Sequence, residues 1–250
     1  PHPHRNKPNE PAFIPLIAAR IAELKGLSID DVARVTTYNV HRLFGIGADP
    51  EREIAYQIRN SLYVALTSRC TNECWFCPRD RNPVVKGHNI GMDARHEPSL
   101  RQVLRAIGDP LPYDEVVFCG FGEPTMRWEI LLETAKWLKS KGVKRVRLNT
   151  NGQGNLLYGR DIVPEMVGLF DAVSISVNEP QAHLYQKVMQ SEFGEKAFEA
   201  VLDFARKCVT LIGDVTLTAL NYPEAELDAV QVLAERIGAK FRVRTYNDLG

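Results

Sequence analysis

The sequence LYVALTSRCTNECWFCPR, residues 62–79, joins a short apolar run to three closely spaced cysteines. The apolar run at 62–67 has the length and the residue types of a buried β-strand. The polar segment after it, which carries Cys70, Cys74 and Cys77 in a C-x3-C-x2-C spacing, is typical of a loop. The stretch therefore predicts a strand whose carboxyl end carries a cluster of thiols.

More strand patterns follow along the chain, separated by segments with helical periodicity. Strands that alternate with helices form parallel sheets, because each helix returns the chain to the same edge. The sequence therefore predicts an α/β fold with six parallel strands. The five further strands are expected at residues 115–119, 145–149, 172–177, 215–220 and 241–246, and the helices at 99–107, 127–141, 162–169, 196–210 and 224–237.

Polar side chains occupy one phase of several predicted strands. In residues 172–178 serine and asparagine alternate with valine and isoleucine, and in 241–246 arginine and tyrosine alternate with phenylalanine and valine. A parallel strand covered on both faces is usually apolar throughout. The alternation favours a partial (β/α)6 TIM-like barrel with a polar interior; an open sheet with one poorly covered face is the alternative.

The beginning of the chain follows a different pattern. It is polar and rich in proline over residues 1–10, and helical periodicity follows at 11–25, 28–35 and 38–44. So short a segment buries little core alone. We therefore predict three parts, a helical segment at 1–48, a linker at 49–60 and an α/β domain at 61–250.

The composition narrows the functional classes. The 250 residues include 31 basic and 31 acidic side chains, so the formal charge is zero and gives no support to a nucleic-acid-binding surface. No apolar run is long enough to span a membrane, and no signal peptide is visible. We expect a cytoplasmic protein, in which thiols stay reduced and clustered cysteines hold metal more often than disulfides.

Three neighbouring thiolates are typical ligands of zinc or of an iron–sulfur cluster. A [4Fe–4S] cluster held by three cysteines keeps one iron free to bind a small molecule. The alternative is a structural zinc site in a non-catalytic binding module, with His88 or His96 from the long segment 79–98 as the fourth ligand. A loop as long as 79–98 is typical of a lid, and His88, Asn89 and His96 are its candidate substrate contacts.

Four motifs at the ends of successive strands resemble those of the radical S-adenosylmethionine (SAM) superfamily. They are the cysteine motif with Phe76 before its last cysteine, GFGEP at 120–124, LNTNG at 148–152 and SISVN at 174–178. In GFGEP, Phe121 stands where that family usually has a second glycine. The CPR, GHN and SxSxN sequences are most similar to the TatD-associated radical SAM proteins.

The resemblance implies a [4Fe–4S] cluster on Cys70, Cys74 and Cys77 that binds SAM. One electron then cleaves SAM to a 5′-deoxyadenosyl radical, which abstracts hydrogen from a small-molecule or peptide substrate. It also implies an electron donor such as flavodoxin or ferredoxin. The residues that the resemblance places near the cofactor are Phe76, Gly120, Gly122, Glu123, Asn149, Asn151, Ser176, Asn178 and Arg244.

Arg242 and Arg244 share one phase of the last strand, so two guanidinium groups are expected inside the barrel. Buried charges need partners of opposite sign. A cofactor carboxylate or an acidic substrate would serve, but we favour an ion network with Glu123 and Asp114.

Residues 1–48 resemble the end of TatD-type metal-dependent hydrolases, from the PxPxR-x3-NEP stretch to NxxRLFG. The metal ligands of those enzymes lie upstream of this segment, so we do not predict nuclease activity. His2 and His4 have a His-x-His spacing but fall in a late loop, and we do not predict them to be ligands. The resemblance implies a functional link to a TatD-like hydrolase, and an accessory domain of such a hydrolase is a further alternative.

Overall fold

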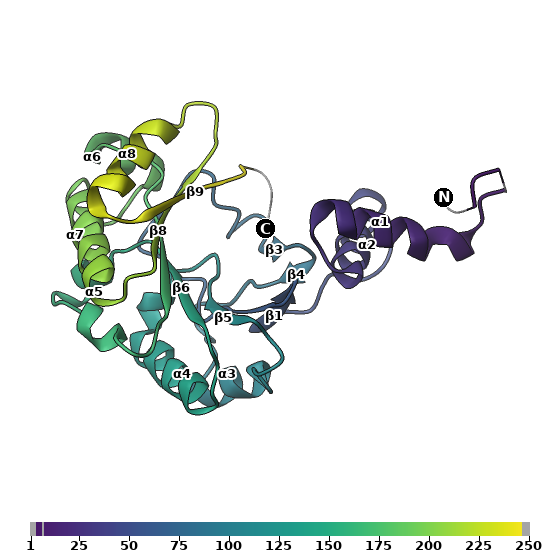
Figure 1. Ribbon diagram of the computed structural model, residues 1–250, viewed down its shortest axis with the longest axis horizontal. Coiled ribbons are helices and arrows are strands. Elements are labelled where there is room, and N and C mark those ends of the chain that lie inside the picture. Colours follow the sequence, from purple (N-terminus) through teal and green to yellow (C-terminus); the bar gives the residue numbers. More distant parts are fainter. Residues whose placement is uncertain (1–3, 7, 247–250) are drawn as a thin grey trace.

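A computed structural model describes residues 4–6 and 8–246 of the chain. Its main element is a seven-stranded sheet, with helices packed along the outer face (Figure 1). The order is β1-β2-β5-β6-β7-β8-β9, in which β1 is antiparallel to β2 and every other pair is parallel. The strands are β1 Ala55–Ile58, β2 Ser61–Val64, β5 Glu115–Phe118, β6 Val146–Thr150, β7 Ala172–Ser176, β8 Val215–Leu220 and β9 Lys240–Arg244.

The outer helices confirm most of the predicted periodicity. Residues 162–169 were wrongly predicted as a helix: a 3-10 turn, η3 Val163–Met166, contains Pro164, and the chain leaves it at Gly168 with a positive φ of 75°. A short helix at 182–189 was missed. The helices are α3 Leu100–Ile107, α4 Trp128–Ser140, α5 Gly154–Tyr158, α6 Ala182–Met189, α7 Lys196–Leu211 and α8 Leu227–Ile237, with a further 3-10 turn, η2 Pro124–Arg127.

The apolar core lies between the sheet and these helices. Val146 and Leu148 of β6 are fully buried there, whereas Arg147 and Asn149, in the other phase, face the inside of the curved sheet. The predicted alternation is therefore confirmed, and with it the α/β, partial TIM-like barrel. Within the described residues no ladder joins the edge strands β1 and β9, so the barrel stays open at that side.

The helical segment comprises η1 Pro11–Phe13, α1 Ile14–Lys25 and α2 Ile29–Phe44. Residues 29–44 form one helix, not the two predicted pieces. Ser28 begins it with a capping box, in which its side chain accepts from the backbone N–H of Asp31 and that carboxylate accepts from the backbone of Ser28. His2 lies outside the described residues, and His4 stacks on Phe13 with 4.5 Å between ring centroids.

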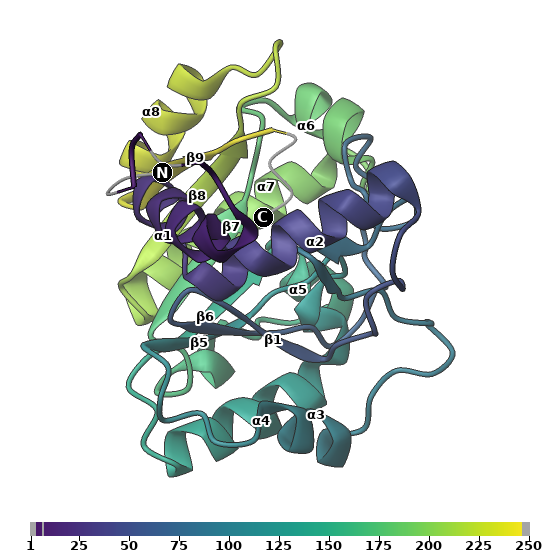
Figure 2. The same ribbon diagram turned by 90° about the vertical axis from the view of Figure 1, so that its right-hand side faces the viewer.

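The predicted linker is partly a strand, since β1 lies within it and pairs with β2. Polar contacts join α2 to segment 79–98; Figure 2 shows α1 and α2 in front of the rest of the chain. Arg34 Nε donates to the carbonyl oxygen of Lys86 at 2.9 Å, and Tyr38 Oη donates to Asn82 Oδ1 at 2.7 Å. Within the described residues no helix has the length and apolarity to cross a membrane.

Candidate active site

A cavity of about 280 Å³ opens at the carboxyl ends of the parallel strands, where the loops of an α/β barrel build active sites. We call it the first cavity. The structure brings to its wall all the residues predicted to hold the cluster or SAM, although they come from the loops and ends of five different strands. They are Cys70, Cys74, Cys77, Phe76, Gly120, Gly122, Glu123, Asn149, Asn151, Ser176, Asn178 and Arg244.

The three thiols lie on the loop after β2, on one side of the first cavity. Burial raises the pKa of Cys70 and of Cys74 to about 12 and also raises that of Cys77. Cys70 Sγ accepts from the backbone N–H of Asn72 at 3.4 Å. In the described part of the chain, no three His, Cys, Asp or Glu side chains are already close enough together to hold a metal ion. Thiols this basic bind as thiolates only when a metal displaces their protons.

Glu123, in the loop after β5, connects this loop to the one after β6. Its Oε1 accepts from Thr125 N at 3.0 Å and from the hydroxyls of Thr125 and Thr150 at 2.7 Å each, and its Oε2 accepts from Asn151 N at 2.6 Å. The side chain is 3% exposed, and burial raises the pKa of Glu123 although these hydrogen bonds oppose the shift. Glu123 therefore orders two loops, and Oε2 retains room for one more donor.

Gly122 is required by a close backbone approach. A Cβ there would lie 2.2 Å from the carbonyl oxygen of Thr67 and 2.7 Å from that of Arg69. The next residue continues the contact, because Glu123 N donates to Arg69 O at 2.8 Å. The glycine turn and the cysteine loop are thus held edge to edge, which is a packing reason for a glycine that the motif alone assigns to the cofactor.

A network of hydrogen bonds between buried side chains joins the cysteine loop to the segment after β6. The sequence did not predict most of it. Asn151 Nδ2 donates to Thr71 Oγ1 at 2.8 Å. Gln153 Nε2 donates to Asn72 Oδ1 and Tyr185 Oη at 2.8 Å each. The run of polar residues at 151–153, directly after a predicted strand, is the signal that could have found the network.

The end of β7 carries two predicted residues with different surroundings. Asn178 is fully buried in a left-handed conformation, φ 62°, and its Oδ1 accepts from Leu220 N at 3.0 Å. It therefore joins β7 to β8. Ser176 Oγ accepts from Arg244 Nη2 at 3.3 Å.

Arg244 Nε is buried and has no partner among the described residues. Burial lowers the pKa of this guanidinium. The ion network predicted with Glu123 and Asp114 is wrong, since among the described residues no ion pair joins either carboxylate to Arg242 or Arg244.

Phe76 belongs to a group of aromatic rings beside the cysteines. Its ring centroid lies 5.6 Å from that of Trp75, with the two rings edge to face. It lies 6.4 Å from that of Tyr222, with the two rings nearly parallel. Trp75 in turn lies 5.6 Å from Tyr246. These rings form an apolar wall between the loop after β2 and the end of the chain that the structure describes.

The histidines of segment 79–98 do not reach the first cavity. This segment forms a two-stranded hairpin of β3 Val84–Val85 and β4 His88–Asn89. Both ring nitrogens of His88 are engaged, at 2.8 Å by Glu53 Oε1 and at 2.9 Å by the carbonyl oxygen of Gln57. His96 is exposed beside Asp93. Neither histidine, nor Asn89, lines the cavity, so the predicted lid contacts and the predicted fourth zinc ligand are wrong.

Comparisons with known families match both parts of the chain. Residues 64–237 match the model of the Radical SAM superfamily, and residues 1–45 match that of the TatD related DNases. Two curated relatives are each 48% identical to this chain, the uncharacterized metal-dependent hydrolases YabD of Bacillus subtilis over 46 residues and YcfH of Escherichia coli over 48 residues. The alignments cover 18% and 19% of this chain, which spans only 18% of either relative's length.

Solved structures share the fold. SuiB of Streptococcus suis, bound to the precursor peptide SuiA, superimposes with a TM-score of 0.55 at 15% identity, over 88% of this chain and 43% of SuiB. SuiB in a second crystal structure gives a TM-score of 0.52 at 14% identity, over 96% of this chain and 46% of SuiB.

Proposed function

Because the chain belongs to the radical SAM superfamily, we propose that Cys70, Cys74 and Cys77 bind a [4Fe–4S] cluster that cleaves SAM to a 5′-deoxyadenosyl radical, for hydrogen abstraction from a substrate. The observation that carries the proposal is the composition of the first cavity. Its wall contains three thiols and also Arg244, whose buried Nε has no partner among the described residues. Those are the donors that a thiolate-bound cluster and an amino-acid carboxylate require.

The remaining roles follow from the geometry of the chain's own side chains. Arg244 lines the first cavity and would bind the carboxylate of SAM, because its Nε has no partner among the described residues, while its Nη2 donates to Ser176. Glu123 Oε2 has a lone pair left to accept from the SAM ammonium group. Phe76 offers an apolar ring face beside the cysteines. When bound, the cluster would supply the electron for the cleavage; the protein orients the cofactor and excludes water.

The partners are proposals of the same kind. A reduced flavodoxin or ferredoxin would donate the electron, and the substrate is a small molecule or a peptide. Reduced thiols suit the cytoplasm, and all five cysteines are free. The match of residues 1–45 to TatD related DNases supports a functional link to a hydrolase of that kind. The activity of a whole hydrolase is not assigned to this chain, which spans 18% of those relatives.

The test is anaerobic reconstitution followed by iron and sulfide analysis. We expect about four irons per chain and production of 5′-deoxyadenosine under reductant. Cys74→Ala should lose both. Cys208→Ala is the matched control, because Cys208 is buried in the core of α7 away from the first cavity, and it should retain both. One zinc without sulfide, or undiminished 5′-deoxyadenosine from Cys74→Ala, would refute the cluster assignment.

A further inference from the structure

Arg242 lies on a wall shared by two cavities. It lines the first cavity, and together with Ser174 it also lines a second one of about 270 Å³. The second cavity lies toward the amino ends of the strands, inside the curve of the sheet. Its other lining residues are Glu115, Arg145, Arg147, Ala172, Asp214, Thr216 and Lys240. The charged members are four bases and two acids, so the wall carries an excess of two positive charges.

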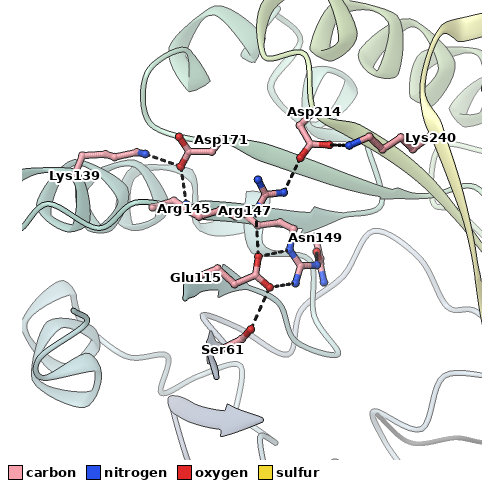
Figure 3. Close-up of polar contacts among 10 residues, drawn as sticks. Ser61, Glu115, Lys139, Arg145, Arg147, Asn149, Asp171, Asp214 and Lys240 are labelled. Atoms are coloured by element: carbon pink, nitrogen blue, oxygen red, sulfur yellow. Dashed lines mark hydrogen bonds and ion pairs between the residues drawn. The ribbon is translucent and has the colours of Figure 1, made fainter. Parts of the chain in front are cut away.

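Both carboxylates of the second cavity are already bound to other bases (Figure 3). Glu115 accepts from Arg147 Nη2 at 2.6 Å and from Arg147 Nε at 3.1 Å, and Arg145 Nε lies 3.5 Å from its Oε2. Asp214 accepts from Arg145 Nη2 at 2.6 Å and from Lys240 Nζ at 2.8 Å. Each carboxylate thus already pairs with two basic side chains, and neither of them pairs with Arg242.

Arg242 itself has no hydrogen bond or ion pair within residues 4–6 and 8–246. Arg244 lies two residues further along β9, and burial together with the positive charge of Arg242 acts to lower the pKa of Arg244. The two guanidinium groups follow the same phase of the strand. Like charges on one wall destabilise the free site, so an anion bound there gains both attraction and relief of repulsion.

We propose that Arg242 binds an oxyanion group of the substrate, a carboxylate or a phosphate, at the boundary of the two cavities. This inference rests on the proposed function, in which Arg244 takes the carboxylate of SAM. The planar guanidinium presents paired N–H donors that match either oxyanion in a bidentate manner. The substrate class is therefore an acid, whose charged group would bind at the solvent-accessible side chain of Arg242.

The test measures anion binding to the cluster-reconstituted protein by calorimetry at low ionic strength. Inorganic phosphate and succinate are the probes, and the one that binds more tightly identifies the oxyanion. We expect Arg242→Gln to raise the dissociation constant of the probe at least tenfold and Arg242→Lys to raise it less. Arg236→Gln is the matched control, because Arg236 is exposed on α8 and lines neither cavity. If neither probe binds, or if Arg242→Gln binds as the wild type does, the proposal is wrong.

The same samples distinguish this proposal from the proposed function. Saturating SAM should leave the probe bound, because the two ligands occupy different arginines. Displacement of the probe by SAM would show that Arg242 belongs to the cofactor's own subsite, which overturns the proposal. A wild-type protein that binds the probe through Arg242 but makes no 5′-deoxyadenosine would refute the proposed function instead of the anion site.

Discussion

The barrel and the helical segment are held together by different interactions. The barrel buries a continuous core; Leu131, Leu138 and Leu148, for example, are fully buried. In α1 and α2, by contrast, only Ala22, Asp31 and Val32 are buried. Large apolar side chains there face solvent, with Leu24 68%, Leu43 74% and Phe44 65% exposed. The helix pair is therefore attached to the barrel mainly by polar contacts, whereas the barrel is stabilised by apolar burial.

The largest expected effect compares the same substitution in the two regions. Leu138→Ala removes a fully buried side chain from α4 and should lower the free energy of unfolding by about 2 to 5 kcal/mol. Leu43→Ala, at an exposed position in α2, should change it by less than about 0.5 kcal/mol. Urea denaturation measures both. Equal losses would contradict the contrast between the two regions.

Gly122→Ala tests the close backbone contact inside the barrel. The new Cβ would meet the carbonyl oxygen of Thr67 at 2.2 Å, so we expect a loss of about 1 to 3 kcal/mol. Gly120→Ala is the control, since the nearest atom to its Cβ would be Ala65 Cβ at 3.3 Å and the backbone atoms around it would lie at 3.7 Å or more. Iron content after reconstitution should fall in the first variant and not in the second, because only the first separates the glycine turn from the cysteine loop. If both variants load iron equally, that contact does not position the cysteines.

Asp31→Asn should loosen the helical segment without weakening the barrel. The Asp31 carboxylate accepts from Ser28 N and Arg59 N at 3.1 Å each and binds Arg34. Although burial raises it, these hydrogen bonds hold the pKa of Asp31 below its usual value. We expect a loss of about 1 to 2 kcal/mol near pH 7, seen as faster amide hydrogen exchange in α2.

The pH dependence of this variant has a definite sign. A carboxyl whose pKa is lower in the folded state stabilises that state above its unfolded pKa, and the contribution disappears as the pH falls through the folded value. The difference in α2 exchange between wild type and Asp31→Asn should therefore shrink below about pH 4. Faster exchange in β5–β8 would mean that the two regions are more tightly coupled than the contacts indicate.

The smallest effect concerns an unfavourable group in the barrel. Glu179 is 3% exposed, its Oε2 has no partner among the described residues, and burial together with Glu226 raises the pKa of Glu179 to about 7. A raised pKa means that the folded state binds the proton more tightly, so stability is lost as the pH rises from about 4.5 through 7. Glu179→Gln should be more stable than wild type at pH 8, by on the order of 1 kcal/mol, and not at pH 4.5. Thermal melting at the two pH values measures this, and a stabilisation independent of pH would contradict it.

Sequence periodicity predicted the sheet better than the crossovers between strands. Alternation identified the strands because one face packs against helices while the other faces a polar interior, and both constraints act on every second residue. The crossover at 162–169 failed because apolar spacing does not distinguish a helix from a 3-10 turn that Pro164 and Gly168 confine. The strand at 55–58 was missed because it lies at the sheet edge, where partner strands far along the chain decide pairing.

The candidate site was predictable in its members but not in its internal contacts. Motifs at successive strand ends gather at one edge of a parallel sheet, so membership in the first cavity followed from topology. The hydrogen-bond partners of Glu123 and of the two ring nitrogens of His88 could not be predicted from the sequence, because each partner lies on a segment many residues away. The roles proposed for the residues of the first cavity toward a cofactor stay predictions.

The sequence by itself determined the α/β class, the strand phases and the grouping of three thiols at a strand end, since these depend on local spacing. Only the tertiary structure decided which charges are compensated. Glu115 and Asp214 are bound to bases from neighbouring strands, whereas Arg242 has no partner in the part of the chain that the structure describes. The physical reason is that a charge interacts over a few ångströms in space, and the strand order and register alone set which side chains come within that distance.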